Sequence, residues 1–489
     1  MISFNFGGMK GISGRLFLSC WLVFSLHVAT NTVREIYLAL AIGDHFSFRV
    51  DEYGGMHPDL FEKPGYGWHI GNNPGASMLA AVPYALARPV VDRVVARVNA
   101  QRAASKAEPP AYNSPWPMAQ NFYKEAWRRG FDVKFGLAAI IMQAFCMAPI
   151  SAAGVVLMYW LLRAVFDSER IALWLSLLYA FGTPLFFRTG YLNQNMIAGH
   201  FAFAGFLLLW NPWGLDWRPR TRILLAGLAG GICLLMDYSG AVALGVLGLY
   251  GLWKERRVST PLWYAGGAAG PVLLLWFYQW RSFGNPFLPG QHWMPPVQWI
   301  ERGYQGVSGP QLDLLWMLAF DYRFGLFVAG PLFLLALAAP FAARRLPRVE
   351  LHAMLIMFAV FWVFFSGVNY TRLQFNTGIR YLAPVFPFMF VPAAAVLVRL
   401  PLRLSCLIGV VAVFQAWCLA MHRDVERGLG VLDPMLHVLT GGFRLPLLTV
   451  LSRIGSGAEF LAQGVSPLPL FVLTGAVLYV LWRPGERAR

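Results

Sequence analysis

Two acidic residues stand out in a chain that carries few charges. Asp51 and Glu52 lie in the stretch HFSFRVDEYGGMHPD, residues 45–59, close behind the first long apolar run. A carboxylate can act as general base on a hydroxyl that comes within hydrogen-bond reach. Neighbouring side chains point about 100° apart on a helix and to opposite faces of a strand, so the two acids are not expected to share one role. Asp51 is the candidate base, and the role of Glu52 stays open.

Arginines, amides and further acids recur at the ends of other apolar runs. The stretch FRTGYLNQN begins one such group and NYTRLQFNTGIRYLAP another. Arginine recognises phosphate through a planar fork of donors, and a charge at membrane depth is costly unless it is paired or functional. This mixture favours an anionic, lipid-linked substrate. The candidate substrate-binding residues are Glu52, Lys63, His69, Asn72, Asn73, Arg188, Asn193, Asn195, Asp237, Tyr238, Arg372, Arg380 and Tyr381.

Several of these residues also have a plainer interpretation. Arg380 and Tyr381 are residue types that commonly anchor a helix at the membrane interface. Asp237, in MDYSG, could cap a helix. His57 and His69 stand twelve residues apart in one loop, where hydrogen bonding explains them as well as a metal does. The sequence alone does not decide between these roles.

Composition places the chain in a membrane. Of its 489 residues, 57% are hydrophobic and 13% are charged, against about 25% charged residues in a typical soluble domain. The net charge of +16 is spread in short groups between apolar runs, which does not fit a nucleic-acid-binding face. The five cysteines lie inside apolar segments without a CxxC spacing, so neither disulfides nor a cysteine metal site are expected.

Apolar runs of about 20 residues, the length that crosses a bilayer, predict an all-α polytopic membrane protein with about twelve transmembrane helices. The predicted spans are 14–34, 135–162, 171–187, 196–213, 223–237, 239–253, 261–280, 325–343, 351–367, 382–398, 404–421 and 467–482.

The basic residues predict the orientation of these spans, because Lys and Arg concentrate in cytoplasmic loops. The groups on one side are Lys10 and Arg15; Arg163 and Arg170; Arg218, Arg220 and Arg222; Lys254, Arg256 and Arg257; Arg344, Arg345 and Arg348; Arg399 and Arg403; and Arg483, Arg487 and Arg489. Both termini are therefore predicted to be cytoplasmic, in a bacterial inner membrane.

The predicted parts follow from this topology. A first helix (1–34) precedes an external loop (35–134) with interfacial helices, one of them over 77–98. Helices 2–7 (135–280), an external loop (281–324) and helices 8–12 (325–489), with an external loop at 422–466, complete the chain.

The order of several motifs resembles the GT-C superfamily of membrane glycosyltransferases, above all the branch related to protein O-mannosyltransferases and aminoarabinose transferases. The motifs are the acid after the first span, EKPGYGWHIGNNPGASMLAAVPYAL in the first loop and TGIRYLAPVFPF late in the chain. The resemblance covers most of the chain and is weakest after residue 420. It implies transfer of a sugar from a polyprenyl phosphate to a hydroxyl on the external face, with inversion and with Asp51 as base.

The chain departs from that family at two places. Where the family has a lysine that meets the phosphate, this sequence reads NNPG, with Asn72 at that position; whether Lys63, in EKPG nine residues earlier, takes over the role stays open. Metal-using members carry acids between the third and fourth spans, whereas this chain reads Asn193-Gln194-Asn195. Amides alone are poor Mg²⁺ ligands, so no metal and no other cofactor is expected.

The sequence therefore predicts a glycosyltransferase whose partners are a polyprenyl-phosphate-linked sugar, the lipid bilayer and a hydroxyl acceptor, with no nucleic acid. The alternative from another class is a transporter or lipid flippase without transferase chemistry. Such proteins usually show paired repeats and binding residues near the membrane midplane. The sugar and the acceptor (protein, lipid or polysaccharide) are not specified by the sequence.

Overall fold

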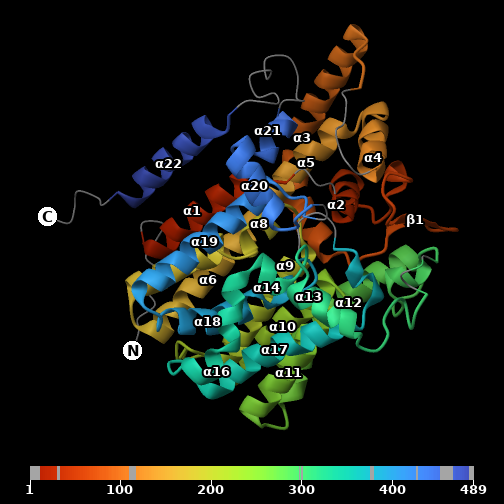
Figure 1. Ribbon diagram of the computed structural model, residues 1–489. Helices are drawn as coiled ribbons and strands as arrows, with labels where there is room; N and C mark the ends of the chain where they lie inside the picture. The colour runs from red at the N-terminus through yellow and green to blue at the C-terminus, as the bar shows by residue number, and fades with distance from the viewer. Residues whose placement is uncertain are drawn as a thin grey trace.

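The computed structural model describes residues 11–29, 33–109, 117–296, 298, 301–374, 379–425, 428–451 and 466–483. Of the basic residues used above to predict orientation, Lys10, Arg487 and Arg489 lie outside these ranges. The described chain is a bundle of helices with one small β-hairpin (Figure 1).

The helices run through the whole described chain. Their bounds are α1 Ile12–Leu26, α2 Arg34–His45, α3 Gly75–Ser105, α4 Pro117–Arg128, α5 Asp132–Met142, α6 Ala148–Phe166, α7 Glu169–Phe181, α8 Leu185–Arg188, α9 Gln194–Trp210, α10 Pro219–Met236, α11 Gly240–Glu255, α12 Thr260–Phe283, α13 Leu312–Phe320, α14 Leu326–Ala329, α15 Leu334–Leu337, α16 Ala339–Ala342, α17 Arg348–Ser366, α18 Phe386–Leu397, α19 Leu402–Met421, α20 Leu432–Gly441, α21 Pro446–Leu451 and α22 Leu468–Trp482.

Four helical stretches of the described chain are long and apolar enough to cross a membrane. They are Asp132–Phe166, in which a π-helical turn joins α5 to α6, and α10, α17 and α19. Three shorter apolar helices, Ile12–Leu26, Ala383–Leu397 and Leu468–Trp482, accompany them. The predicted helical fold, with helices long and apolar enough to span a membrane, is thus confirmed, whereas the count of about twelve spans is not.

Two predicted spans are interrupted. The run 14–34 divides into α1, which ends at Leu26, and a separate helix α2, which begins at Arg34. The run 325–343 divides into α14, α15 and α16 with a short 3-10 turn at Pro331–Phe333. Pro331 and Pro340 explain this second break, because proline lacks the backbone N–H that a continuing helix needs.

Small residues bring α10 and α12 unusually close together. A Cβ atom on Gly227 would lie 2.0 Å from the Tyr264 carbonyl oxygen, and one on Gly267 would lie 1.9 Å from the Leu224 carbonyl oxygen. Only glycine permits such an approach, which is the usual basis of tight helix packing in membranes. Asp237 and Tyr238 lie in the tight turn that follows α10, in which the Asp237 N–H donates to the Cys233 carbonyl and the Gly240 N–H donates to the Asp237 carbonyl.

The first predicted loop is an ordered structure. After α2 come a 3-10 turn (Asp51–Tyr53) and an antiparallel hairpin of β1 Leu60–Lys63 and β2 Gly67–Ile70, in which Leu60 pairs with Ile70. The predicted interfacial helix over 77–98 lies within α3, a single helix of 31 residues. It projects beyond the rest of the bundle at the top of Figure 1.

Candidate functional site

A network of charges and amides joins α2, the first loop, α9 and the α10–α11 turn. Arg34 forms ion pairs with Asp59 and with Glu35, whose carboxylate lies 3.3 Å from the Arg34 Nε. Asn72 donates to Glu35 (2.9 Å) and to the Gln194 side-chain oxygen (3.2 Å). Gln194 in turn donates to Asp237. Four distant parts of the sequence thus meet in one polar cluster, which we call the ionic network.

The motif GNNPG explains why Asn72 lies in the ionic network. Asn73 donates to the Leu234 carbonyl at the end of α10. Gly75 opens α3 so close to α10 that a Cβ atom there would lie 2.7 Å from the Leu235 carbonyl oxygen. These contacts hold the start of α3 against the end of α10 and set Asn72 between Glu35 and Gln194.

Arg380 and Tyr381 lie beside this network. The charges of Arg380, Arg34 and Asp59 all act on the Tyr381 hydroxyl, as does that of Asp237. Arg380 also lies with its guanidinium 5.2 Å from the centre of the Tyr381 ring. Two candidates from the late motif TGIRYLAP are therefore brought together with Asp237 from the α10–α11 turn.

Arg188 is buried, and no acidic side chain among the described residues forms an ion pair with it. Its side chain is 1% exposed, and its Nε and Nη1 atoms find no hydrogen-bond partner among the described residues. Arg380 and Tyr381 are near enough to act on its charge, and the Tyr191 ring lies 5.0 Å from its guanidinium. A buried charge with unused donors is costly. An arginine kept in this state indicates a site for an anion.

Arg423, an arginine that was not among the residues selected from the sequence, lies close to Arg188. Arg423 donates to the carbonyls of Phe187 and His27 (both 3.1 Å), yet its Nε has no partner among the described atoms. Arg188 and Arg423 act on each other's charge. The two arginines thus place spare donors from α8 and from the end of α19 in one region.

The amides at the start of α9 add further unpaired atoms. Asn193 caps α9 by accepting from the Met196 N–H at 3.3 Å, which leaves its Nδ2 without a partner in the described chain. The buried Oδ1 of Asn195 also has no hydrogen-bond partner among the described residues. Most buried polar side-chain atoms in native proteins have a partner, so this concentration near Arg188 also favours a bound polar group.

Asp51 has different surroundings. Its carboxylate pairs with Arg49 at 2.9 Å, accepts from the Trp68 N–H at 2.7 Å and is 47% exposed. No ion pair or hydrogen bond of the described side chains joins it to the ionic network. Its assignment as base therefore stays a prediction, and Glu52, which faces His45 at 3.8 Å, stays equally open.

Four other candidates hold the scaffold together. Lys63 donates to the Phe283 carbonyl at the end of α12 and lies 3.5 Å from the centre of the Trp293 ring. Both ring nitrogens of His69 face backbone carbonyls, of Phe48 and Tyr66, at 3.1 Å.

The remaining two are equally engaged. The Tyr238 hydroxyl accepts from Gln279 and from the Gly290 N–H. Arg372 pairs with Asp313 of α13 at 2.6 Å. Each of the four therefore has a structural explanation of its own.

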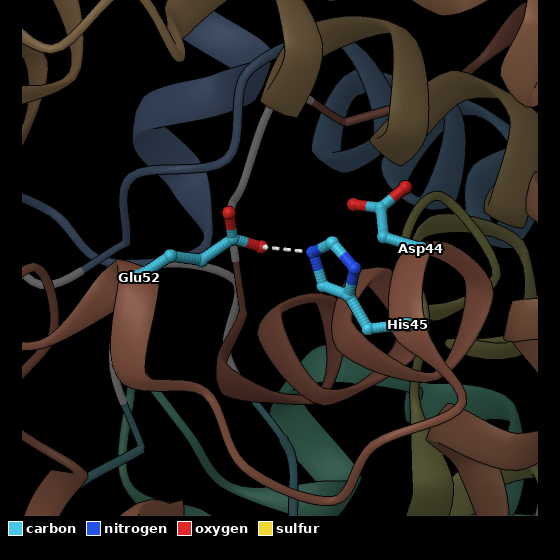
Figure 2. Close-up of side chains that lie close together, drawn as sticks. All are labelled: Asp44, His45 and Glu52. Atoms are coloured by element: carbon cyan, nitrogen blue, oxygen red, sulfur yellow. Dashed lines mark ion pairs between the residues drawn. The ribbon is translucent and has the colours of Figure 1, made fainter.

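Asp44, His45 and Glu52 are near enough to one another to hold a metal ion. Figure 2 shows His45 between the two acids, with its ion pair to Glu52 as a dashed line. Asp44, however, already meets Lys134 (2.7 Å) and Arg88 (3.3 Å), and it accepts from the Tyr84 hydroxyl. These two cations offset its charge, so the arrangement ties α2 to α3 and α5 and favours no cation.

The main residues that sequence reasoning missed are Arg34, Glu35 and Arg423. Arg34 stands at the predicted edge of the first span and Glu35 directly follows it. Arg34 and Glu35 could have been selected from the sequence, because a basic and an acidic residue stand side by side at a predicted membrane boundary. Asp59 and Gln194 were visible as polar residues, but their partners lie far away in the sequence.

Comparison with known proteins bears on the fold. No protein-family model matches the sequence, and no curated protein does. Two solved structures of ArnT from Cupriavidus metallidurans are similar. The apo form is 16% identical, covers 95% of this chain and 74% of its own, and has a TM-score of 0.48. The form bound to undecaprenyl phosphate is 15% identical, covers 96% and 75%, and has a TM-score of 0.50. At this identity the likeness concerns the fold, and the chain therefore has the fold of ArnT, which agrees with the resemblance of its motifs.

Proposed function

We propose that this protein is a GT-C glycosyltransferase that takes a sugar from a polyprenyl phosphate and passes it to a hydroxyl acceptor. The observation that carries the proposal is Arg188, buried with two unused donors beside a network that contains carboxylates. The structural neighbour was solved with undecaprenyl phosphate, which supports a lipid of the same class here.

In this proposal Arg188 holds the donor phosphate, and Arg380 and Arg423 add positive charge beside it. Guanidinium forks match phosphate oxygens and form strong, charge-assisted hydrogen bonds. When the bond between the anomeric carbon and the phosphate oxygen breaks, its electron pair passes to the polyprenyl phosphate. Donors already aimed at that oxygen stabilise the departing negative charge without having to reorganise.

The proposed base is Asp59. Its carboxylate lies close to Arg34 and Arg380 and is still partly exposed, so an acceptor hydroxyl could reach it. Its side chain is 31% exposed, it pairs with Arg34, and the charge of Arg380 acts on it. It would take the proton from the acceptor hydroxyl as the new glycosidic bond forms opposite the leaving phosphate, with inversion. Asp51, predicted from the sequence for this role, is the comparison residue in the test below.

The proposal is tested with the purified protein and a panel of polyprenyl-phosphate sugars, with and without EDTA. We expect transfer to a hydroxyl acceptor and release of the polyprenyl phosphate, both unchanged by EDTA. Loss of activity with EDTA would contradict a metal-independent site. A protein that instead moves polyprenyl phosphate across proteoliposomes, with no glycosylated product, would be the flippase of the alternative hypothesis.

The pH dependence follows from Asp59 and His57. Burial raises the pKa of the Asp59 carboxyl, but Arg34, His57 and Arg380 together lower it by more, so the pKa lies below its usual 3.8. Burial lowers the pKa of His57 below 6.5. The carboxylate is therefore ionised from about pH 5 upward, and the imidazole is mostly neutral above about pH 6.5. We expect kcat/KM for transfer to be flat between about pH 6.5 and pH 8; a change within that window would point to another base.

A further inference from the structure

A cavity of about 730 Å³, open to the outside, lies between the first loop and α4. One wall is the segment that contains Met56, His57 and Leu60, together with Trp68 of β2. The other wall is one face of α4, whose Asn121, Phe122, Lys124, Glu125 and Arg128 all line it. These positions recur at the spacing of a single helix face.

The two walls are fastened to each other just beyond α4. Arg129 donates to the carbonyls of Gly54 (3.2 Å) and Glu52. The guanidinium also lies 5.3 Å from the centre of the Phe131 ring. The cavity is thus held by defined contacts between the first loop and the end of α4.

His57 connects this cavity to the ionic network. His57 is one of the lining residues, and its Nδ1 accepts from the Asp59 N–H at 3.0 Å. Because Nδ1 is the acceptor, a neutral His57 ring carries its proton on Nε2, where it can donate to a bound oxygen. A ligand in the cavity would therefore lie next to Asp59, the proposed base.

The lining combines aromatic surface with one unpaired positive charge. Trp68 and Phe122 are among the lining residues, and aromatic rings offer an apolar surface on which the C–H faces of a sugar can pack. Arg128 and Glu125 satisfy each other through two hydrogen bonds, of 2.8 and 2.6 Å. Lys124 forms no ion pair within the part of the chain that the structure describes. The charge free to meet a ligand is therefore positive.

We propose that this cavity binds the acceptor, and that the acceptor is a sugar unit carrying a carboxylate or a phosphate. This rests on the proposed function, because it gives the transferase its second substrate. Trp68 and Phe122 would hold the sugar ring, Lys124 its anionic group, and His57 a hydroxyl oxygen close to Asp59. The anionic sugar could come from a soluble glycan or from a glycolipid headgroup.

The test measures binding without turnover, by saturation-transfer NMR on the full-length protein in detergent. The probes are glucuronate, glucose 6-phosphate and neutral methyl glucoside. We expect the two anionic sugars to bind, with Lys124→Gln weakening them about fivefold to tenfold, the effect of one charge-assisted hydrogen bond. Lys106→Gln, at the exposed C-terminal cap of α3, is the matched control and should change nothing. Equal binding of the neutral sugar, or no effect of Lys124→Gln, would overturn the proposal.

Two competitors identify the source of the sugar. Tetraglucuronate in solution and a glucuronosyl diacylglycerol in mixed micelles are added to the glucuronate complex. Displacement by one of them supports the proposal and names the source, whereas displacement by neither overturns it. A protein that binds acidic sugars but transfers nothing would refute the proposed function alone. If the protein transfers sugar but Lys124→Gln binds the anionic sugars as well as the wild type does, only the proposed acceptor cavity is refuted.

Discussion

Replacing Arg188 by methionine is expected to slow sugar transfer about a hundredfold to a thousandfold, while leaving the protein as stable as before or more stable. Arg188 is 1% exposed and has two unsatisfied donors. Replacing a buried ion pair with apolar residues of similar volume is often neutral or stabilises a protein by about 1–4 kcal/mol, and replacing Arg188 breaks no ion pair of the described residues. Removing a donor that stabilises the transition-state charge costs about a hundredfold to a thousandfold in kcat. Opposite effects on stability and on activity would mark a residue kept for function.

The two effects are measured by thermal unfolding in detergent and by the initial rate of transfer. Adding undecaprenyl phosphate should raise the Tm of the wild type, because a ligand that binds only the folded state stabilises it, but not that of Arg188→Met. Arg163→Met is the matched control, since Arg163 is 51% exposed and pairs with Glu169 at 3.1 Å. If Arg188→Met unfolds at a lower temperature than the wild type, Arg188 is a structural residue and the donor site lies elsewhere.

How far the sequence predicted the site can be judged from single residues. Arg188, Arg380 and Asp237 were selected because they are charges at the ends of apolar runs, and the structure places all three around Tyr381 or the ionic network. Sequence reasoning can select such residues because a charge near a membrane has few stable positions, and their roles in binding stay predictions. The resemblance to the GT-C superfamily rested on the order of motifs rather than on any one of them.

The remaining assignments depended on contacts that no local pattern contains. Asn72 bonds Gln194, which is 122 residues away, and Lys63 reaches the Phe283 carbonyl, 220 residues away. Local periodicity says nothing about such partners. Arg34 and Glu35 were missed because the first apolar run was taken to extend to residue 34, although α1 ends at Leu26. The boundary of a helix is the part of a sequence-based prediction that is least certain, and here two network residues lie beyond it.

Comparing Asp59→Asn with Asp51→Asn is the second experiment with a large expected effect. Asp59→Asn should lower kcat about a thousandfold, within the range for loss of a general base, because an amide cannot accept the acceptor's proton. Asp51→Asn should retain activity within a few-fold, since its carboxylate is exposed and pairs with Arg49.

Both variants keep the size of the side chain, and both are measured for transfer and for thermal unfolding. Arg34 retains Glu35 as a partner in Asp59→Asn, so the fold is expected to survive and KM for the donor to change little. The control is Asp92→Asn on the exposed part of α3, where the carboxylate pairs with Arg88 at 3.3 Å. An inactive Asp51→Asn beside an active Asp59→Asn would return the base to Asp51. It would then require the exposed first loop, rather than the ionic network, to meet the sugar.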